Sequence, residues 1–103
     1  MKFSVLMPVY IKESPDFLAQ SLESILVNQS VLPNEVIIVE DGPVTLEIKS
    51  VLDYYCNKFP DLVHCFQLKK NMGMGYAMNY GLNKCKYEWV FRMDSDDISR
   101  PNR

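Results

Sequence analysis

The chain has 103 residues, a formal net charge of -2, 48% hydrophobic residues and 23% charged residues. This composition is typical of a globular protein, and the length allows one modest hydrophobic core but not two domains. The largest basic cluster is Lys69 and Lys70, which argues against nucleic acid as a partner and leaves a small anionic ligand open.

The amino-terminal apolar run is interrupted at Pro8, so it is too short for a secretory signal. No stretch approaches the ~20 apolar residues that span a bilayer. Cys56, Cys65 and Cys85 form no CxxC motif, and the chain has a single histidine, so there is no Cys/His set with zinc-ligand spacing; this argues against a disulfide framework or a zinc site. We expect reduced, buried thiols in a cytoplasmic protein.

Strands and helices are predicted to alternate along the chain. Residues 4–9 form an almost continuous apolar run, as expected for a strand that is covered on both faces. Ser14 and Pro15 are suited to the N-cap and first position of a helix, and apolar residues then recur with helical spacing up to Leu26. Residues 35–39, rich in β-branched side chains, predict a second buried strand.

The alternation continues to the carboxyl-terminal end. A second helix is predicted from a Thr45 cap to Pro60, and the remaining elements are a strand at 62–68, a helix at 75–85 and a strand at 87–93. We expect Met74, Met78, Leu82 and Cys85 to form the apolar face of the third helix. The other core candidates are Met72, Met93 and Trp89.

The order βαβαβαβ predicts a parallel sheet with helices on both faces, a Rossmann-like, three-layer α/β/α fold. In such sheets, ligands bind outside the carboxyl ends of the strands. The residues that the four strands deliver there are Pro8, Val9 and Tyr10; Glu40, Asp41 and Gly42; residues 69–75; and Asp94, Ser95, Asp96 and Asp97.

The last of these groups places three carboxylates within four residues, directly after an apolar run. Such carboxylates repel one another unless a hard divalent cation supplies compensating charge. An isolated acidic cluster is about as often a solvated turn or a helix cap, as Asp readily serves both. Its position at the end of a buried strand favours the metal.

The other loops carry weaker signals. Asp41 could accept hydrogen bonds from a ribose or a base, although, taken alone, an Asx-turn into Gly42 and Pro43 explains it better. Asn71, Gly73 and Gly75 precede a helix, where backbone N–H groups could approach a diphosphate; a left-handed turn would also explain a glycine there. The segment is neither a P-loop nor a dinucleotide fingerprint. The ring of Tyr10 could stack on a nucleobase or pack within its loop.

Several segments together resemble the opening of glycosyltransferase family 2. They cover the whole chain in order, and the combination is specific although no single piece is. The matching segments are residues 5–10, 22–30, 35–42, 71–73, 77–82 and 94–103.

The resemblance implies a GT-A fold and an inverting, metal-dependent transferase, which moves a sugar from a nucleoside diphosphate to an acceptor hydroxyl. It implies that Asp96 is the direct ligand of Mn2+ or Mg2+, with Asp94 beside it and Asp97 in support. A UDP-sugar is the expected donor, and a glycan or lipid-linked molecule is the expected acceptor. The nucleotide-binding residues that it implies are Pro8, Val9, Tyr10, Glu13, Asp41, Asn71, Gly73, Asn79, Asp94 and Ser95.

Two residues depart from the family pattern. Met78 stands where the family often has Arg or Lys near the diphosphate, so Lys69, Lys70 or the metal must carry more of that charge. Glu40 replaces a more common Asp. Neither change removes a metal ligand.

The resemblance also implies that residues 1–103 are the donor-binding half of a larger domain. The family takes the carboxylate that deprotonates the acceptor from the second half, so we expect the general base beyond Arg103, no catalytic residue before it, and no activity from this portion alone. The unfinished sheet edge offers a route to self-association. The full-length enzyme is expected in the cytoplasm or at the inner face of the membrane.

Two other functions compete with this one. A noncatalytic nucleotide-binding or assembly module would use the acidic edge for a protein partner. A phosphotransfer domain would need a catalytic Asp after the first strand, where the sequence has Glu13 and no Asp before Asp16, so it ranks last.

Overall fold

The computed structural model describes residues 2–27 and 32–93, and its strands and helices alternate as predicted. The predicted and observed elements differ only at their ends. The strands are β1 (Phe3–Val9), β2 (Glu35–Glu40), β3 (Val63–Gln67) and β4 (Trp89–Arg92); the helices are α1 (Pro15–Leu26), α2 (Leu46–Lys58) and α3 (Met74–Lys84).

The four strands form one parallel sheet in the order β3-β2-β1-β4. In the register of the central strands, Leu6 lies opposite Ile37 on one side and Arg92 on the other. The chain winds from β1 through β2 to β3 in one direction and then returns to place β4 on the far side of β1. The winding therefore reverses between β1 and β4, which is where open α/β sheets bind ligands.

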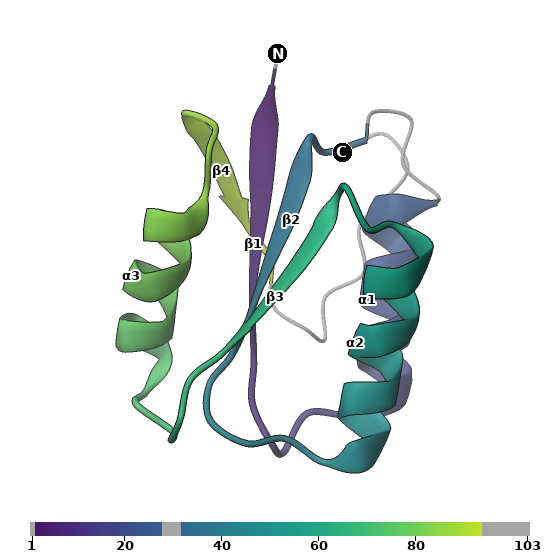
Figure 1. The fold of residues 1–103 in the computed structure, drawn as a ribbon, viewed down its shortest axis with the longest axis vertical. Helices are drawn as coiled ribbons and strands as arrows, with labels where there is room; N and C mark the ends of the chain where they lie inside the picture. Colours follow the sequence, from purple (N-terminus) through teal and green to yellow (C-terminus); the bar gives the residue numbers. More distant parts are fainter. Residues whose placement is uncertain (1, 28–31, 94–103) are drawn as a thin grey trace.

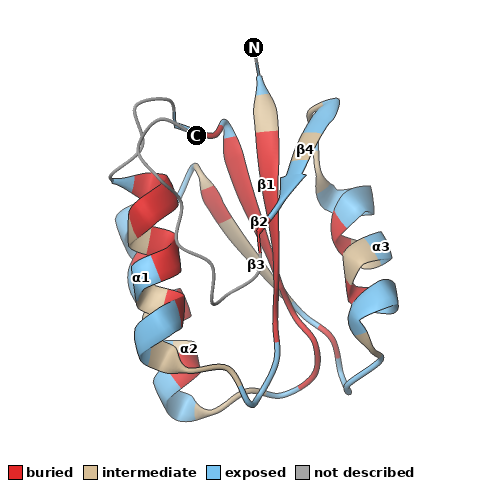
Figure 2. Cartoon of the chain, turned by 180° about the vertical axis from the view of Figure 1, so that it is seen from behind, coloured by how far each residue is buried: buried red, intermediate tan, exposed pale blue. Residues whose placement is uncertain are grey.

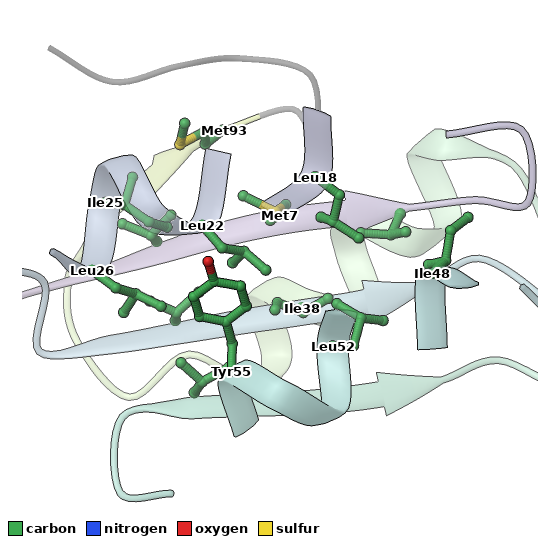
Figure 3. Close-up of a cluster of buried hydrophobic side chains, with 14 residues drawn as sticks. Met7, Leu18, Leu22, Ile25, Leu26, Ile38, Ile48, Leu52, Tyr55 and Met93 are labelled. Carbon is green, nitrogen blue, oxygen red and sulfur yellow. The ribbon is translucent and has the colours of Figure 1, made fainter. Parts of the chain in front are cut away.

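Helices cover both faces of this sheet, so the predicted three-layer fold is confirmed. Helices α1 and α2 lie on one face and α3 lies on the other (Figure 1). Successive side chains of β1 alternate between two buried clusters: Val5 and Met7 lie under α1 and α2, while Leu6 lies under α3. Burial is concentrated in β1, β2 and the inner sides of α1 and α2 (Figures 2 and 3).

The helix starts follow from local sequence. The Ser14 hydroxyl accepts a hydrogen bond from the Phe17 N–H at 3.4 Å, with Pro15 at the first helical position. The Thr45 hydroxyl accepts one from the Ile48 N–H at 3.1 Å. Both predicted caps are confirmed, and each satisfies a backbone N–H that has no partner within its helix.

The predicted apolar face of α3 is wrong in part. The buried residues of this helix are Ala77 and Gly81, whereas Met74 and Leu82 are exposed. A Cβ at Gly81 would lie 2.3 Å from Leu6 Cδ1, so the helix backbone lies directly against the sheet. Small residues therefore face the sheet, and the larger apolar residues lie at the sides of the contact.

The expectation that Trp89 lies in the core is also wrong, because its side chain is 56% exposed. Val90 packs on the α3 side, so the alternation of β4 turns Trp89 and Phe91 to the opposite face. Because β4 is the edge strand of the described sheet, it has a neighbouring strand on one side only. On this face the Phe91 ring contacts the Phe3 ring edge-to-face. Met72 is exposed as well, in contrast to the buried Met93.

The three cysteines are free thiols, and each is half-buried instead of fully buried as expected. None of the described helices is long and apolar enough to cross a membrane.

Candidate nucleotide-binding site

Backbone hydrogen bonds tie the carboxyl ends of three strands together. The Asp41 N–H donates to the Val9 carbonyl at 2.7 Å, and the Leu68 N–H donates to the Glu40 carbonyl at 2.9 Å. The segments that follow β1, β2 and β3 therefore start from one edge of the sheet, as predicted.

At this edge Asp41 organises the loop that leads into α3. Its side chain is buried, with 6% exposure, and its Oδ1 accepts a hydrogen bond from the Met72 N–H at 2.7 Å. The side-chain amide of Asn71 donates to the Asp41 carbonyl at 3.4 Å. Two predicted site residues are thus in direct contact. The bond to the Met72 N–H was missed, because it depends on the exact path of the loop and not only on the edge at which the loops meet.

Gly42 allows the same loop to approach closely. Its φ of +91° lies in the left-handed region, and a Cβ here would lie 2.6 Å from the Asn71 backbone nitrogen. A side chain at this position would therefore push residues 70–71 away from Asp41.

The loop ends at Gly73, which is the N-cap residue of α3 and has φ +93°. The Gly73 carbonyl accepts the first helical hydrogen bond, from the Ala77 N–H at 3.1 Å, and no side chain caps the helix. The amino end of α3 therefore lies at the carboxyl edge of the sheet, the orientation that suits a phosphate. Asn79 is exposed further along α3.

Tyr10 follows β1 at this edge and is 36% exposed. Its carbonyl accepts a hydrogen bond from the Glu13 N–H at 3.1 Å, which closes a turn. Pro8 and Val9 are buried, and the Val9 side chain lies in the cluster under α1 and α2. Of the predicted Pro8, Val9 and Tyr10 group, Tyr10 is therefore the residue with an accessible side chain.

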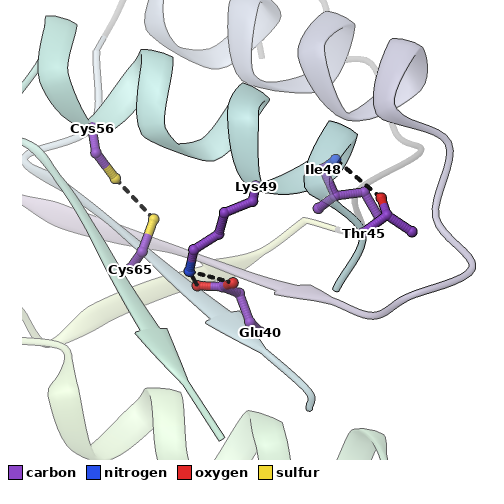
Figure 4. Close-up of polar contacts among 6 residues, drawn as sticks. All are labelled: Glu40, Thr45, Ile48, Lys49, Cys56 and Cys65. Atoms are coloured by element: carbon purple, nitrogen blue, oxygen red, sulfur yellow. Dashed lines mark hydrogen bonds and ion pairs between the residues drawn. The ribbon is translucent and has the colours of Figure 1, made fainter. Parts of the chain in front are cut away.

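Glu40 has a structural partner on α2. Its carboxylate is 1% exposed and lies 3.0 and 3.2 Å from the Lys49 ammonium (Figure 4). The bond to this carboxylate raises the pKa of Lys49 above its ordinary value. Because side chains alternate along β2, Glu40 faces α2 while Asp41 faces the α3 side. Glu40, which replaces the more common Asp of the family pattern, thus links β2 to α2 through its ion pair with Lys49.

The predicted metal-binding cluster, Asp94 to Asp97 with Ser95, lies outside the described residues. The residue before it is Met93, whose N–H donates to the Leu6 carbonyl at 3.0 Å, so β1 and the last described residue lie side by side. This contact lies next to the point where the winding of the sheet reverses. Within residues 2–27 and 32–93 there is no group of three or more His, Cys, Asp or Glu side chains that could hold a metal ion.

These features define an open parallel α/β sheet with a candidate ligand site at the carboxyl ends of its strands. The sequence profile of Glycosyl transferase family 2 matches residues 4–103. The chain belongs to glycosyltransferase family 2.

Two relatives show the extent of the similarity. The UDP-Gal:alpha-D-GlcNAc-diphosphoundecaprenol beta-1,3-galactosyltransferase of Escherichia coli is 53% identical over 102 residues, which are 99% of this chain and 36% of that protein. The amylovoran biosynthesis glycosyltransferase AmsE of Erwinia amylovora is 44% identical over 101 residues, 98% of this chain and 37% of that protein. The chain thus spans little more than a third of the length of these relatives.

Solved structures confirm the GT-A fold. S. aureus TarS in complex with UDP-GlcNAc is 33% identical with a TM-score of 0.80, over 98% of this chain and 28% of that one. The mannosyltransferase PcManGT from Pyrobaculum calidifontis, in complex with GDP-Man and Mn2+, has a TM-score of 0.80 over 94% of this chain and 28% of that one. At 22% identity, the second likeness shows the fold alone.

Proposed function

We propose that the chain is the donor-binding part of an inverting, metal-dependent glycosyltransferase. The observation that carries this proposal is the contact of Asp41 with residues 71–72 at the carboxyl edge of the sheet, in a chain of glycosyltransferase family 2. The complete enzyme transfers a sugar from a nucleoside diphosphate to an acceptor hydroxyl.

UDP-sugars are the proposed donors. The names of the Escherichia coli relative and of the TarS complex, which contain UDP-Gal and UDP-GlcNAc, support this choice. The exposed Tyr10 ring stacks on the base, and Asp41 accepts a hydrogen bond from the base or the ribose. Glu13 and Asn79 belong to the wider nucleotide-binding set that the family resemblance implies.

The diphosphate lies near the amino end of α3 in this proposal. The first N–H groups of α3, which have no partner within the helix, are available at the carboxyl edge, and the exposed residues Lys69 and Lys70 supply positive charge that Met78 does not. Neutralising the leaving diphosphate lowers the free energy of the transition state, in which negative charge develops there.

Asp94 and Asp96 would hold Mn2+ or Mg2+, since carboxylate oxygens are the ligands that these ions prefer. Ser95 belongs with Asp94 to the nucleotide-binding group. When bound, the ion supplies further positive charge to the diphosphate. Asp94 and Asp96 come shortly after Met93, which lies beside β1, and this position in the chain fits the role of metal ligands.

The general base and most of the acceptor site are proposed to lie in the part of the enzyme that corresponds to the remaining length of the relatives. A carboxylate there takes the proton of the acceptor hydroxyl, whose oxygen bonds to the anomeric carbon from the face opposite the diphosphate; the bond from that carbon to the diphosphate breaks, and the centre is inverted. A glycan or a lipid-linked molecule is the proposed acceptor. A lipid-linked acceptor would bring the enzyme to the inner face of the membrane.

Calorimetric titration with UDP tests the proposal. With Mn2+ present we expect the original protein to bind UDP. Leaving out the metal, or introducing Asp96→Asn or Asp41→Asn, should weaken this binding about tenfold or more, since each change removes a charged contact. Asp61→Asn is the matched control, because Asp61 is exposed before β3, at the opposite edge of the sheet. Equal affinity in all of these would refute the proposal. Binding of a protein partner without UDP affinity would instead favour a noncatalytic assembly module.

A further inference from the structure

Two of the three thiols lie in contact, away from the candidate nucleotide site. Cys56 on α2 and Cys65 on β3 have their sulfur atoms 2.8 Å apart in a hydrogen bond (Figure 4). The two positions are nine residues apart, so the contact joins consecutive elements of the fold. Both side chains are half-buried, and both pack against the core under α1 and α2.

We propose that Cys56 and Cys65 form a reversible intramolecular disulfide when the protein meets a small-molecule disulfide such as oxidised glutathione. A disulfide has a sulfur separation of about 2.0 Å, so the two atoms need approach by only about 0.8 Å more. Cys85, which follows α3 on the other face of the sheet, is not part of the pair. The inference does not depend on the proposed glycosyltransferase function.

The two thiols differ in acidity, which gives them different parts in the reaction. The hydrogen bond from Cys65 lowers the pKa of Cys56 below its ordinary value. The same hydrogen bond, together with burial, raises the pKa of Cys65. Cys56 is therefore the attacking thiolate and Cys65 the resolving thiol.

The exchange proceeds in two balanced steps. The Cys56 thiolate attacks one sulfur of oxidised glutathione, which forms a mixed disulfide and releases one glutathione thiolate. Cys65 then gives up its proton and attacks the Cys56 sulfur, which forms the intramolecular bond and releases the second glutathione thiolate. Two protein thiols are oxidised, one glutathione disulfide is reduced to two glutathione thiols, and the released thiolates take up the two protons.

The bond would link α2 covalently to β3. Because it closes a short loop of chain that is free in the unfolded state, we expect oxidation to raise the unfolding midpoint by roughly 5–15 °C.

The test is to incubate the purified protein with oxidised glutathione, block free thiols with iodoacetamide in denaturant, and measure the mass. We expect a loss of about 2 Da before alkylation, one modified thiol in place of three, and a proteolytic fragment that joins the segments of Cys56 and Cys65. A dithiol reductant should restore all three thiols. Three alkylated thiols after oxidation, or stable glutathione adducts alone, would overturn the proposal.

Two variants identify the pair. Cys85→Ser should still lose about 2 Da, whereas Cys65→Ser should stop at the glutathione adduct of Cys56 because no resolving thiol remains. A cross-link that persists in Cys65→Ser, or that disappears in Cys85→Ser, would assign the bond to other residues and contradict the inference.

Discussion

Asp41 is buried, and its carboxylate accepts a hydrogen bond from the Met72 N–H at 2.7 Å, so it holds the loop before α3 in place. Asp41→Ala removes this charged acceptor, and we expect the free energy of unfolding to fall by about 1–3 kcal/mol in urea titration. Asp41→Asn keeps an oxygen that can accept the bond and should cost less. If the alanine variant is as stable as the original protein, the loop does not depend on this contact.

Gly42 makes the other close contact with that loop. Gly42→Ala combines a positive φ with a Cβ 2.6 Å from backbone, so we expect a loss of about 2 kcal/mol or more in the free energy of unfolding. Gly73→Ala carries the φ penalty alone, because nothing lies within 4 Å of its Cβ. Gly75→Ala, in open space within α3 and with no positive φ, should be neutral or stabilising. Equal effects at Gly42 and Gly75 would contradict this order.

At the scale of the elements, α3 lies close to the sheet because position 81 has no side chain. A Cβ there would lie 2.3 Å from Leu6 Cδ1 and 3.0 Å from Val39 Cγ2. We expect Gly81→Ala to destabilise the protein by about 1–3 kcal/mol through overpacking. Leu6→Val removes part of the obstacle, so the double variant should be destabilised by less than the sum of the two single changes. Strict additivity in denaturant unfolding would show that the two positions do not meet.

Helices α1 and α2 are joined by Tyr55, whose hydroxyl donates to Glu23 Oε2 at 2.9 Å. Burial, together with this hydrogen bond, raises the pKa of Tyr55 to about 12. Because the folded value lies above the ordinary 10, the protonated form favours folding, and this contribution is lost as the pH rises from 10 through 12. We expect a loss of about 1–2 kcal/mol, reduced by partial solvent screening.

The measurement is urea unfolding at pH 8, 10 and 11.5. Over this range the original protein should lose more stability than Tyr55→Phe does. Tyr54→Phe, a change at an exposed neighbour, should still show the loss. If Tyr55→Phe declines as steeply as the original protein, the hydroxyl does not contribute in this way.

For the whole molecule, periodicity and end signals were enough to predict the order of elements and the edge where the loops meet. Ser14, Thr45 and the β-branched run before Glu40 act locally, so their consequences can be predicted from the sequence. The features that were not predicted depend on tertiary structure. Trp89 is exposed because β4 is an edge strand, which no local pattern records.

In the candidate site, too, some features could be predicted from the sequence and others could not. The parallel topology predicted that the loops with Asp41 and Asn71 lie at the same edge of the sheet, but it did not predict the hydrogen bond between the two residues. The bond to the Met72 N–H and the pairing of Cys56 with Cys65 depend on the path of each loop and on helix orientation, so spacing in the chain gives no sign of them.

The central claim is that a nucleotide binds at the carboxyl edge of the sheet. The most direct measurement is the change in backbone amide chemical shifts when the isotope-labelled protein is titrated with UDP and Mg2+. We predict the largest changes at Tyr10, Asp41 and Gly73. Changes confined to the opposite edge, at Asn34 and Leu62, or no changes at all, would contradict the account.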